Sequence, residues 1–349
     1  MLFRSMKPVD FGKYDCKIIN QRNNGTSEFA GTFDIIDEIC NKHYGYQGYT
    51  KRFIREAAHF QTLFHTKIRN LSDYDLLDIN KLYGYSMTKC YIPAGKPIII
   101  PSTFKPSEDQ TFVVEVEIVS IDEKRWSKDF VKGSIHKLDN IMYYNLIRYQ
   151  NATFKIIRGI YWPNPDKDYH IRKVATNILN KIAVEDDEKK KKTLKNTLNQ
   201  VWGMLLSKND FKIHTFTDLD KMRKYAKKWI MFVCGSSKKK NGDYILRSKR
   251  YLDVNYVNNL LGVHILSASK SIMFNIFDFC DKNNIHICYC NTDSLLIEKK
   301  YLDLLSDYIG PNPGQLKIEA EYDSIEIASQ GKYCFKKDGV IIKSQGDFV

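Results

Sequence analysis

Residues 285–297 read Ile-His-Ile-Cys-Tyr-Cys-Asn-Thr-Asp-Ser-Leu-Leu-Ile, a polar centre between two short apolar runs. The first run alternates between apolar and other residues, which predicts a strand, and Leu295–Ile297 predict a second. Asn291–Ser294 would then form a tight hairpin turn that holds the Asp293 carboxylate at one end of a small buried sheet. Such an aspartate often only hydrogen-bonds its own backbone, so its meaning depends on the rest of the chain.

A second carboxylate occupies a comparable place earlier in the sequence. Asp78 follows the short apolar run Tyr74–Leu77, as Asp293 stands beside an apolar run. Two carboxylates at strand ends can hold two Mg²⁺ ions about 3.5–4 Å apart for in-line displacement at phosphorus. Mg²⁺ takes hard oxygen ligands and completes its shell with water and substrate phosphates. The structural alternative for Asp78 is the cap of a helix.

A third candidate group lies in Lys195–Gly203, which reads Lys-Asn-Thr-Leu-Asn-Gln-Val-Trp-Gly. Lys195, Asn199 and Trp202 are spaced i, i+4 and i+7, so they share one face of a helix. A cation, an amide and a large ring on one face suit a triphosphate, a sugar and a base pair. Gly203 would let the base pair approach the backbone closely. An ordinary amphipathic helix with an exposed lysine fits the same residues.

The composition favours a soluble, intracellular protein with a polyanionic partner. Lysine plus arginine (54) exceed aspartate plus glutamate (41), which gives a net charge of +13 and a pI of about 9.1. This surplus indicates DNA or RNA, although the codon bias of an AT-rich genome also enriches lysine. The eight cysteines form no Cys-x-x-Cys pair, which indicates a reducing compartment. No uninterrupted apolar run reaches about 18 residues, so we expect no membrane segment.

Periodicity predicts both strands and helices, with residues enough for roughly two or three domains. Thr111–Val119 alternates and is a half-buried strand, whereas 53–64 fits a helix or a strand equally. Segments 169–184 and 189–206 are amphipathic and form an antiparallel helical hairpin. The Lys-rich stretch 207–250 reads as irregular. Further expectations are an extended 92–101, strands at 151–162, 316–319 and 322–327, and a long helix at 260–280 that leads into the opening stretch.

Three of these stretches, in this order, resemble motifs A, B and C of the family B DNA polymerases. They are Asp78–Gly84, Lys195–Gly203 and Tyr289–Ser294. They look most like the protein-primed branch of phages, eukaryotic viruses, linear plasmids and organelles, which writes them D-x-x-S-L-Y-P, K-x-x-x-N-S-x-Y-G and Y-x-D-T-D-S. Ile92–Pro97 and Gly314–Glu319 are also similar to the family. The resemblance covers roughly residues 55–340.

The resemblance implies a role for each matching residue. The catalytic carboxylates, which would bind two Mg²⁺ ions, are Asp78 and Asp293. The nucleotide-binding residues would be Tyr83, which excludes a ribose 2′-hydroxyl, Lys181 and Lys195 at the triphosphate, and Asn199 at the nascent base pair. The DNA-binding residues would be Tyr289, Thr292, Lys332 and Tyr333.

The fold that the resemblance implies is α+β, in the right-hand polymerase architecture. It has a palm with an antiparallel sheet, fingers made of a helical hairpin, and a short thumb. The expected division is an N-terminal segment leading into the palm (1–70), palm with motif A (71–168), fingers with motif B (169–206), a second insertion and palm with motif C (207–310), and a partial thumb (311–349). Two DNA-gripping insertions would fall within 100–168 and 207–255.

The sequence also departs from the family pattern. Asn291 replaces the first acid of D-T-D, which weakens the anionic field that attracts Mg²⁺. Lys81 and Gly84 replace the Ser and Pro of motif A, and Gln200 and Trp202 replace the Ser and Tyr of motif B. The thumb motif K-x-Y appears as Gly-Lys-Tyr at 331–333, with its lysine shifted by one, and the upstream Y-x-G-G motif is absent. Only 77 residues precede Asp78, so we expect no proofreading exonuclease in this chain, either because it is lacking or because a separate chain carries it.

The expected function is a DNA-directed DNA polymerase that adds dNTPs to a primer or a terminal-protein hydroxyl by two-metal phosphoryl transfer. The expected partners are primer-template DNA, dNTPs, a terminal protein and an exonuclease-bearing chain, with no membrane. The alternative from another class is a catalytically decayed module that binds nucleic acid, which Asn291 and the rewritten motifs favour. A reverse transcriptase is disfavoured because the Lys-to-Gly helix motif belongs to family B.

Overall fold

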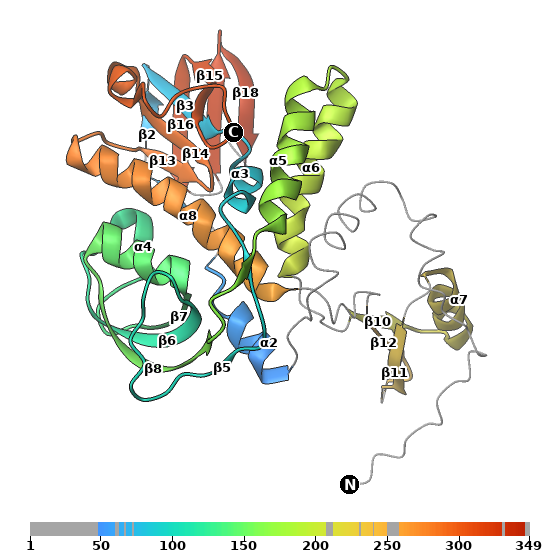
Figure 1. The fold of residues 1–349 in the computed structure, drawn as a ribbon. Coiled ribbons are helices and arrows are strands. Elements are labelled where there is room, and N and C mark those ends of the chain that lie inside the picture. Colours follow the sequence, from blue (N-terminus) through green and yellow to red (C-terminus); the bar gives the residue numbers. More distant parts are fainter. Residues whose placement is uncertain are drawn as a thin grey trace.

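The structure is a computed structural model that describes residues 48–59, 63–65, 68–71, 73–206, 212–229, 232–239, 241–249, 258–329 and 332–345. Most of the N-terminal segment expected at 1–70 therefore lies outside the described residues. The described chain is a mixed α and β fold of antiparallel sheets, with the long helix α8 (Asn259–Lys282) crossing its middle (Figure 1).

A five-stranded antiparallel sheet carries the opening stretch. Its strand order is β1 (Leu63–His65), β13 (Tyr289–Asn291), β14 (Ser294–Glu298), β3 (Tyr74–Ile79) and β15 (Leu316–Tyr322). We call it the central sheet. The pairing places both Ser294 of β14 and Lys317 of β15 opposite Asp78 of β3. The hairpin predicted from the sequence is therefore confirmed, and its neighbour is the strand that carries Asp78.

The first strand of that hairpin is shorter than its alternation predicts. It begins at Tyr289 and not at Ile285. Ile285 and Ile287 are still buried, at 4% exposure each, but Ile285 N–H donates to the carbonyl of Cys280, 2.8 Å away, and so closes the end of α8. Residues 285–288 lead the chain out of α8, because Asn284, in a left-handed backbone conformation (φ 55°), reverses the chain direction there.

Helix α8 supplies the centre of the core, as the predicted helix at 260–280 requires. Asn258 caps its first turn by accepting a hydrogen bond from Leu261 N–H at 3.1 Å. Phe274 and Phe277 are fully buried and pack with Leu77, Leu295 and other residues of the central sheet. The helix is long and apolar enough to cross a membrane, but 78% of its apolar window is buried inside the protein, as in the central helix of a globular core.

A second sheet covers α8 on another side, with order β5 (Ile98–Ile99), β8 (Thr153–Trp162), β6 (Thr111–Ser120) and β7 (Ile135–Asp139). The strands predicted at 111–119 and 151–162 are confirmed as β6 and β8. The extended segment 92–101 contributes β5 and also β4 (Ile92–Pro93), which pairs with β9 (Lys167–Asp168). Sequence periodicity missed β7 and the following helix α4 (Asn140–Gln150), and a short 3₁₀ turn lies at Arg125–Ser127.

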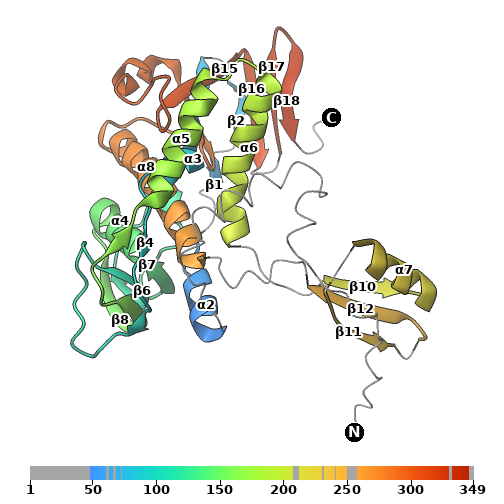
Figure 2. The same ribbon diagram turned by 45° about the vertical axis from the view of Figure 1, so that its right-hand side comes forward.

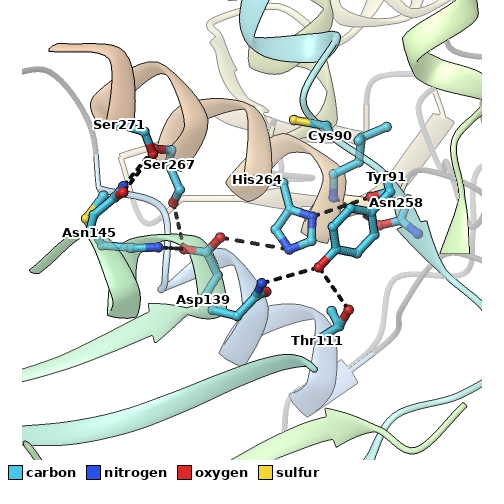
Figure 3. A network of polar contacts seen from close by, with 12 residues as sticks. Cys90, Tyr91, Thr111, Asp139, Asn145, Asn258, His264, Ser267 and Ser271 are labelled. Atoms are coloured by element: carbon cyan, nitrogen blue, oxygen red, sulfur yellow. Dashed lines mark hydrogen bonds and ion pairs between the residues drawn. The ribbon is translucent and has the colours of Figure 1, made fainter. Parts of the chain in front are cut away.

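A buried polar network joins this sheet to α8 (Figure 3). The Asp139 carboxylate accepts from Ser267 Oγ at 2.6 Å and from Met142 N–H at 3.2 Å. Its other oxygen lies 3.8 Å from His264 Nε2, and both side chains are fully buried. The Nδ1 atom of His264 lies 3.4 Å from the carbonyl of Tyr91. Burial raises the pKa of Asp139 to about 7 and lowers that of His264 to about 4, so both groups favour their neutral forms.

Two antiparallel helices, α5 (His170–Val184) and α6 (Glu188–Leu205), stand side by side (Figures 1 and 2). They confirm the predicted hairpin at 169–184 and 189–206. Asp187 caps α6 by accepting from Lys189 N–H at 2.9 Å. The apolar faces of both helices pack on the short helix α3 (Leu82–Met87) and on the first half of α8. The hairpin is thus seated directly over the residues that follow Asp78.

Residues 212–249 form a small unit of their own, which corrects the irregular reading of 207–250. Strands β10 (Lys212–Phe216), β12 (Tyr244–Lys249) and β11 (Phe232–Lys238) pair in that order, beside helix α7 (Leu219–Trp229). The unit lies apart from the rest (Figure 2) and buries its own pair, Met222 and Leu246.

A fourth sheet lies beside the central sheet and contains the C-terminal described residues. Its order is β18 (Val340–Gln345), β17 (Lys332–Lys337), β16 (Ser324–Ser329) and β2 (Ile68–Leu71). The predicted strands at 316–319 and 322–327 correspond to β15 and β16. Tyr322, Phe335 and Leu296 bury their side chains between this sheet and the central one. Two short 3₁₀ turns, Lys299–Tyr301 and Asp303–Leu305, connect β14 to the segment before β15. The undecided segment 53–64 contains the end of helix α2 (Gly48–Arg55) and the beginning of β1.

Candidate active site

The central sheet brings together Asp78 and Asp293, which are 215 residues apart in the sequence. Asp78 is the next-to-last residue of β3, and Asp293 occupies the tip of the β13–β14 hairpin. The main chain fixes their separation, because Ile79 N–H donates to the carbonyl of Asp293 at 3.0 Å. Burial first, and the negative charge of Asp78 second, raise the pKa of Asp293 to about 6. The two carboxylates therefore act on each other, as a shared cation site requires.

The hairpin tip that presents Asp293 is unusually tight. Asp293 N–H donates to the carbonyl of Asn291 at 2.8 Å, which closes a three-residue turn around Thr292. Thr292 has φ 62°, a left-handed conformation that a β-branched residue rarely adopts. The Thr292 hydroxyl lies 3.4 Å from Asn291 Oδ1. Asn291, the residue that replaces an acid in the motif, thus lies beside the carboxylates at the end of β13.

On its other side, Asp78 faces a lysine. Lys317 Nζ lies 3.2 Å from Asp78 Oδ2, and the Lys317 side chain is 47% exposed. Ser294 Oγ lies 3.5 Å from the other carboxylate oxygen, at the limit of a hydrogen bond. Asp78 itself is 21% exposed, so the ion pair is accessible from the surface.

The turn before β15 holds Lys317 in this position. Gly314 has φ 86°, and a Cβ at this residue would overlap the ring of Tyr85, so only glycine fits. Gly314 N–H donates to the carbonyl of Asn80 at 2.7 Å, and Asn80 N–H donates to the carbonyl of Gln315 at 2.8 Å. Strand β15 is therefore fastened to the end of β3 on both sides of Asn80.

Lys317 belongs to a group of four lysines above the carboxylates. Burial first, then the positive charges of Lys195, Lys191 and Lys317, lower the pKa of Lys81. Lys81 is half-buried at the start of α3 and has φ 53°. Lys191 and Lys195 come from one face of α6. A group of cations that weaken one another's charge in this way would suit a polyanion.

Tyr83 lies between the helical hairpin and the carboxylates. Its ring packs against Trp202 of α6, with centroids 5.0 Å apart and the planes inclined at 32°. Burial first, and the charge of Asp293 second, raise the pKa of Tyr83 to about 12. The phenol is thus neutral and close to the hairpin tip. The role at an incoming sugar that the family resemblance implies for Tyr83 stays a prediction.

The other predicted nucleotide-binding residues lie on the helical hairpin. Lys195 and Asn199 are exposed, and Trp202 is half-buried, so the face predicted from the i, i+4 and i+7 spacing exists. A Cβ on Gly203 would meet no atom within 4 Å, so its surroundings are open. Lys181 is exposed in the last turn of α5.

The predicted DNA-binding residues divide into two groups. Thr292 is half-buried at the hairpin tip and Lys332 is exposed on β17. Tyr289 and Tyr333 are buried, at 3% and 7% exposure, and their ring centroids lie 5.9 Å apart. Both rings pack in the cluster that joins the fourth sheet to the central one, and their role at DNA stays a prediction. Alternating strand letters do not reveal that both faces of β13 are covered.

The donor set suits Mg²⁺ better than a softer metal. Among the described residues, no group of three His, Cys, Asp or Glu side chains could hold a metal ion. Two carboxylates with mutual repulsion suit an ion that takes one or two protein carboxylates and completes its shell with water and phosphates. Asp78 and Asp293 therefore fit Mg²⁺ when a phosphorylated substrate supplies further oxygens.

Sequence analysis missed two functional candidates, Lys317 and Lys191, and treated Lys81 only as a departure. Lys317 lies in a strand with an ordinary alternation of apolar and charged residues. Only the register of β15 against β3 brings it to Asp78. Lys191 is one turn before Lys195 on the same helix, so an i, i+4 reading of α6 could have found it.

The fold resembles that of Phi29 DNA polymerase. The chain superposes on Phi29 DNA polymerase complexed with primer-template DNA with a TM-score of 0.63 and 17% sequence identity, covering 95% of this chain and 59% of that one. The ternary complex of Phi29 DNA polymerase with primer-template DNA and incoming nucleotides gives 0.62 and 16%, covering 99% and 65%. The chain thus spans about three fifths of the length of these polymerases. No protein-family profile and no curated protein matches the sequence.

Proposed function

We propose that the chain is a DNA-directed DNA polymerase that adds dNTPs to a primer or terminal-protein hydroxyl by two-metal phosphoryl transfer. The observation that carries the proposal is the placement of Asp78 and Asp293 at adjacent strand ends of the central sheet. The main-chain hydrogen bond from Ile79 to Asp293 fixes that placement. The polymerase fold supports it independently of the site residues.

In this proposal the central sheet and α8 form the palm, and α5 and α6 form the fingers. The fourth sheet, β2 with β16–β18, is the part of a thumb that the described residues contain. Because β15 pairs with β3 in the central sheet, we place the border between palm and thumb after Tyr322 and not at residue 311. The second sheet and the 212–249 unit would be the two insertions.

The residues would divide the chemistry as follows. Lys195 and Lys191 would bind the phosphates of the incoming nucleotide, and Asn199 would contact the nascent base pair from the same face of α6. Tyr83, held by Trp202, would lie against the sugar. Bound Mg²⁺ would activate the attacking hydroxyl and neutralise charge on the leaving pyrophosphate. Asp78 and Asp293 would hold the reacting atoms in line, so that positioning and electrostatics lower the barrier.

A specific pair of observations favours a second candidate, a decayed polymerase module that binds nucleic acid without synthesis. Asn291 removes one acid beside the carboxylates, and the Lys317 ammonium pairs with Asp78 at 3.2 Å. Both reduce the negative potential that attracts metal. The lysines around Lys81 would still bind a phosphate backbone. This candidate keeps the DNA partner and gives up the reaction.

Primer extension on the purified chain with Mg²⁺ distinguishes the two. Template-directed addition of dNTPs by the wild-type protein, lost in Asp78→Asn and in Asp293→Asn while DNA binding stays nearly unchanged, supports the polymerase. The isosteric amides keep the local shape, so the comparison isolates the charge. If either variant kept more than a few per cent of wild-type extension, the carboxylates would not be the metal ligands. DNA binding without any extension by the wild type supports the decayed module.

A further inference from the structure

We infer that Lys317 is an internal counter-cation of Asp78 that competes with divalent metal for this carboxylate and so sets the metal affinity of the site. The inference rests on the proposed function, because it takes Asp78 as a metal ligand. It assigns to Lys317, which lies outside motifs A, B and C, a positioning role.

The geometry ties the lysine to one carboxylate oxygen. Lys317 and Asp78 are paired residues on neighbouring antiparallel strands, so their side chains leave the same face of the sheet. The Nζ–Oδ2 distance is 3.2 Å, where a unit charge interacts strongly with its partner even beside water. A metal ion bound to that oxygen would have to displace the ammonium or tolerate its repulsion.

The backbone around Lys317 limits how far the lysine can withdraw. Gly314 and Gln315 bond to the two main-chain groups of Asn80, and β15 continues along β3 as far as Tyr322, paired with Tyr74. The strand therefore cannot move away when a metal arrives. Only the side chain can move, and with 47% of its surface exposed it has room to rotate toward solvent.

The charges around Lys317 and Asp78 influence the competition between the lysine and a metal ion for the carboxylate. Lys81, with Lys191 and Lys195 nearby, already adds positive charge above the site, and Asn291 supplies no compensating acid. A Lys317 ammonium displaced toward solvent would thus still be repelled by these neighbouring cations unless an anion such as a nucleotide triphosphate neutralises them. The arrangement couples metal binding to phosphate binding, because each polyanion that neutralises the lysines also makes the displacement of Lys317 easier.

The test is Mn²⁺ binding to the metal-free protein without DNA or nucleotide, followed by the electron paramagnetic resonance signal of free Mn²⁺. Lys317→Met keeps the length of the side chain and removes its charge. We expect it to bind Mn²⁺ about fivefold or more tightly than the wild type, whereas Lys317→Arg, which keeps the charge, stays close to wild type. A double variant that adds Asp78→Asn to Lys317→Met should lose the gain, because the competition requires both partners.

A matched control removes a similar ion pair elsewhere. Lys336 of β17 lies 3.8 Å from Glu326 of β16, is 35% exposed and has no place in the proposed site. Lys336→Met should leave Mn²⁺ affinity unchanged, and equal thermal unfolding of all variants checks that each is folded.

The outcomes separate this inference from the proposed function. Unchanged or weaker Mn²⁺ binding by Lys317→Met, with binding by wild type intact and lost in Asp78→Asn, overturns the inference and leaves the metal assignment standing. Binding that Asp78→Asn does not affect overturns both. Added pyrophosphate should reduce the difference between wild type and Lys317→Met, and a difference that grows instead would contradict the coupling to phosphate.

Discussion

The ring of Tyr83 packs against the indole of Trp202, with their centroids 5.0 Å apart, and so links the first turn of α3 to the last turn of α6. The contact fixes the tyrosine from above, while Asp293 lies close enough to influence its phenol. The packing against Trp202 limits the rotation of the Tyr83 ring. Such restraint would suit the sugar-selecting role that we propose for Tyr83.

Tyr83→Val should therefore admit ribonucleotides. Removal of the ring opens space for a 2′-hydroxyl, and we expect the ratio of rNTP to dNTP addition to rise by at least tenfold in single-nucleotide extension. Tyr83→Phe keeps the ring and serves as the control, which should retain the discrimination of the wild type. Equal discrimination by Tyr83→Val and wild type would remove Tyr83 from this role.

Asn291→Asp should raise the metal affinity of the site. The new carboxylate would lie beside Asp293 and add one negative charge near both ions, so extension should increase or appear at lower Mg²⁺ concentration. Parallel Mg²⁺ titrations of the two proteins measure the shift. A shift toward higher Mg²⁺ would mean that the surroundings of Asn291 have adapted to a neutral side chain.

DNA affinity should fall steeply with salt. The net charge of +13 acts through phosphates, so the logarithm of the binding constant should decrease linearly with the logarithm of salt concentration. Backbone contacts carry no sequence information, and we expect duplexes of different sequence to bind alike. Fluorescence anisotropy at several salt concentrations gives the slope. A flat response, or strong selection for one sequence, is the contrary result.

The buried pair Asp139 and His264 should give opposite pH slopes of stability when either member is removed. In His264→Gln, Asp139 keeps a folded-state pKa near 7, well above that of an unfolded aspartate. The contribution of Asp139 to the free energy of unfolding is then complete below about pH 4 and is lost as the pH rises toward 7. In Asp139→Asn, His264 keeps a folded-state pKa near 4, below its unfolded value. Stability should then be complete above pH 6.5 and be lost as pH falls toward 4.

Urea unfolding between pH 4 and 7 measures these slopes, each at most about 1.4 kcal/mol per pH unit. The double variant Asp139→Asn/His264→Gln provides the background from all other groups. Parallel slopes in the two single variants would show that burial does not shift the pKa values of Asp139 and His264 in opposite directions.

Much of the site could be predicted because it depends on local sequence. The helices at 169–184, 189–206 and 260–280 have strong periodicity, and the two-strand hairpin around Asp293 has turn residues between apolar runs. The shared face of Lys195 and Asn199 follows from helical geometry alone. These features need no knowledge of tertiary structure.

What could not be predicted depends on register and burial. The pairing of Lys317 with Asp78 arises from the alignment of two strands far apart in sequence. The burial of Tyr289 and Tyr333 arises from the fourth sheet covering the hairpin. The 212–249 unit was not predicted because its many lysines obscure the sequence pattern of a small apolar core. The first strand of the hairpin was predicted to be too long because residues 285–288 are apolar for another reason, the closure of α8.

Helix α8 contributes buried residues to three separate clusters: Phe274 to the one shared with the central sheet, Ile265 to the one beneath the helical hairpin, and Val263 to the one beneath α2 and the second sheet. None of these three layers can lose its packing without exposing part of the same helix. They should therefore melt as one cooperative block, while the 212–249 unit, which buries its own residues, can open separately. The parts of the protein that would bind nucleotide, metal and primer should therefore unfold together.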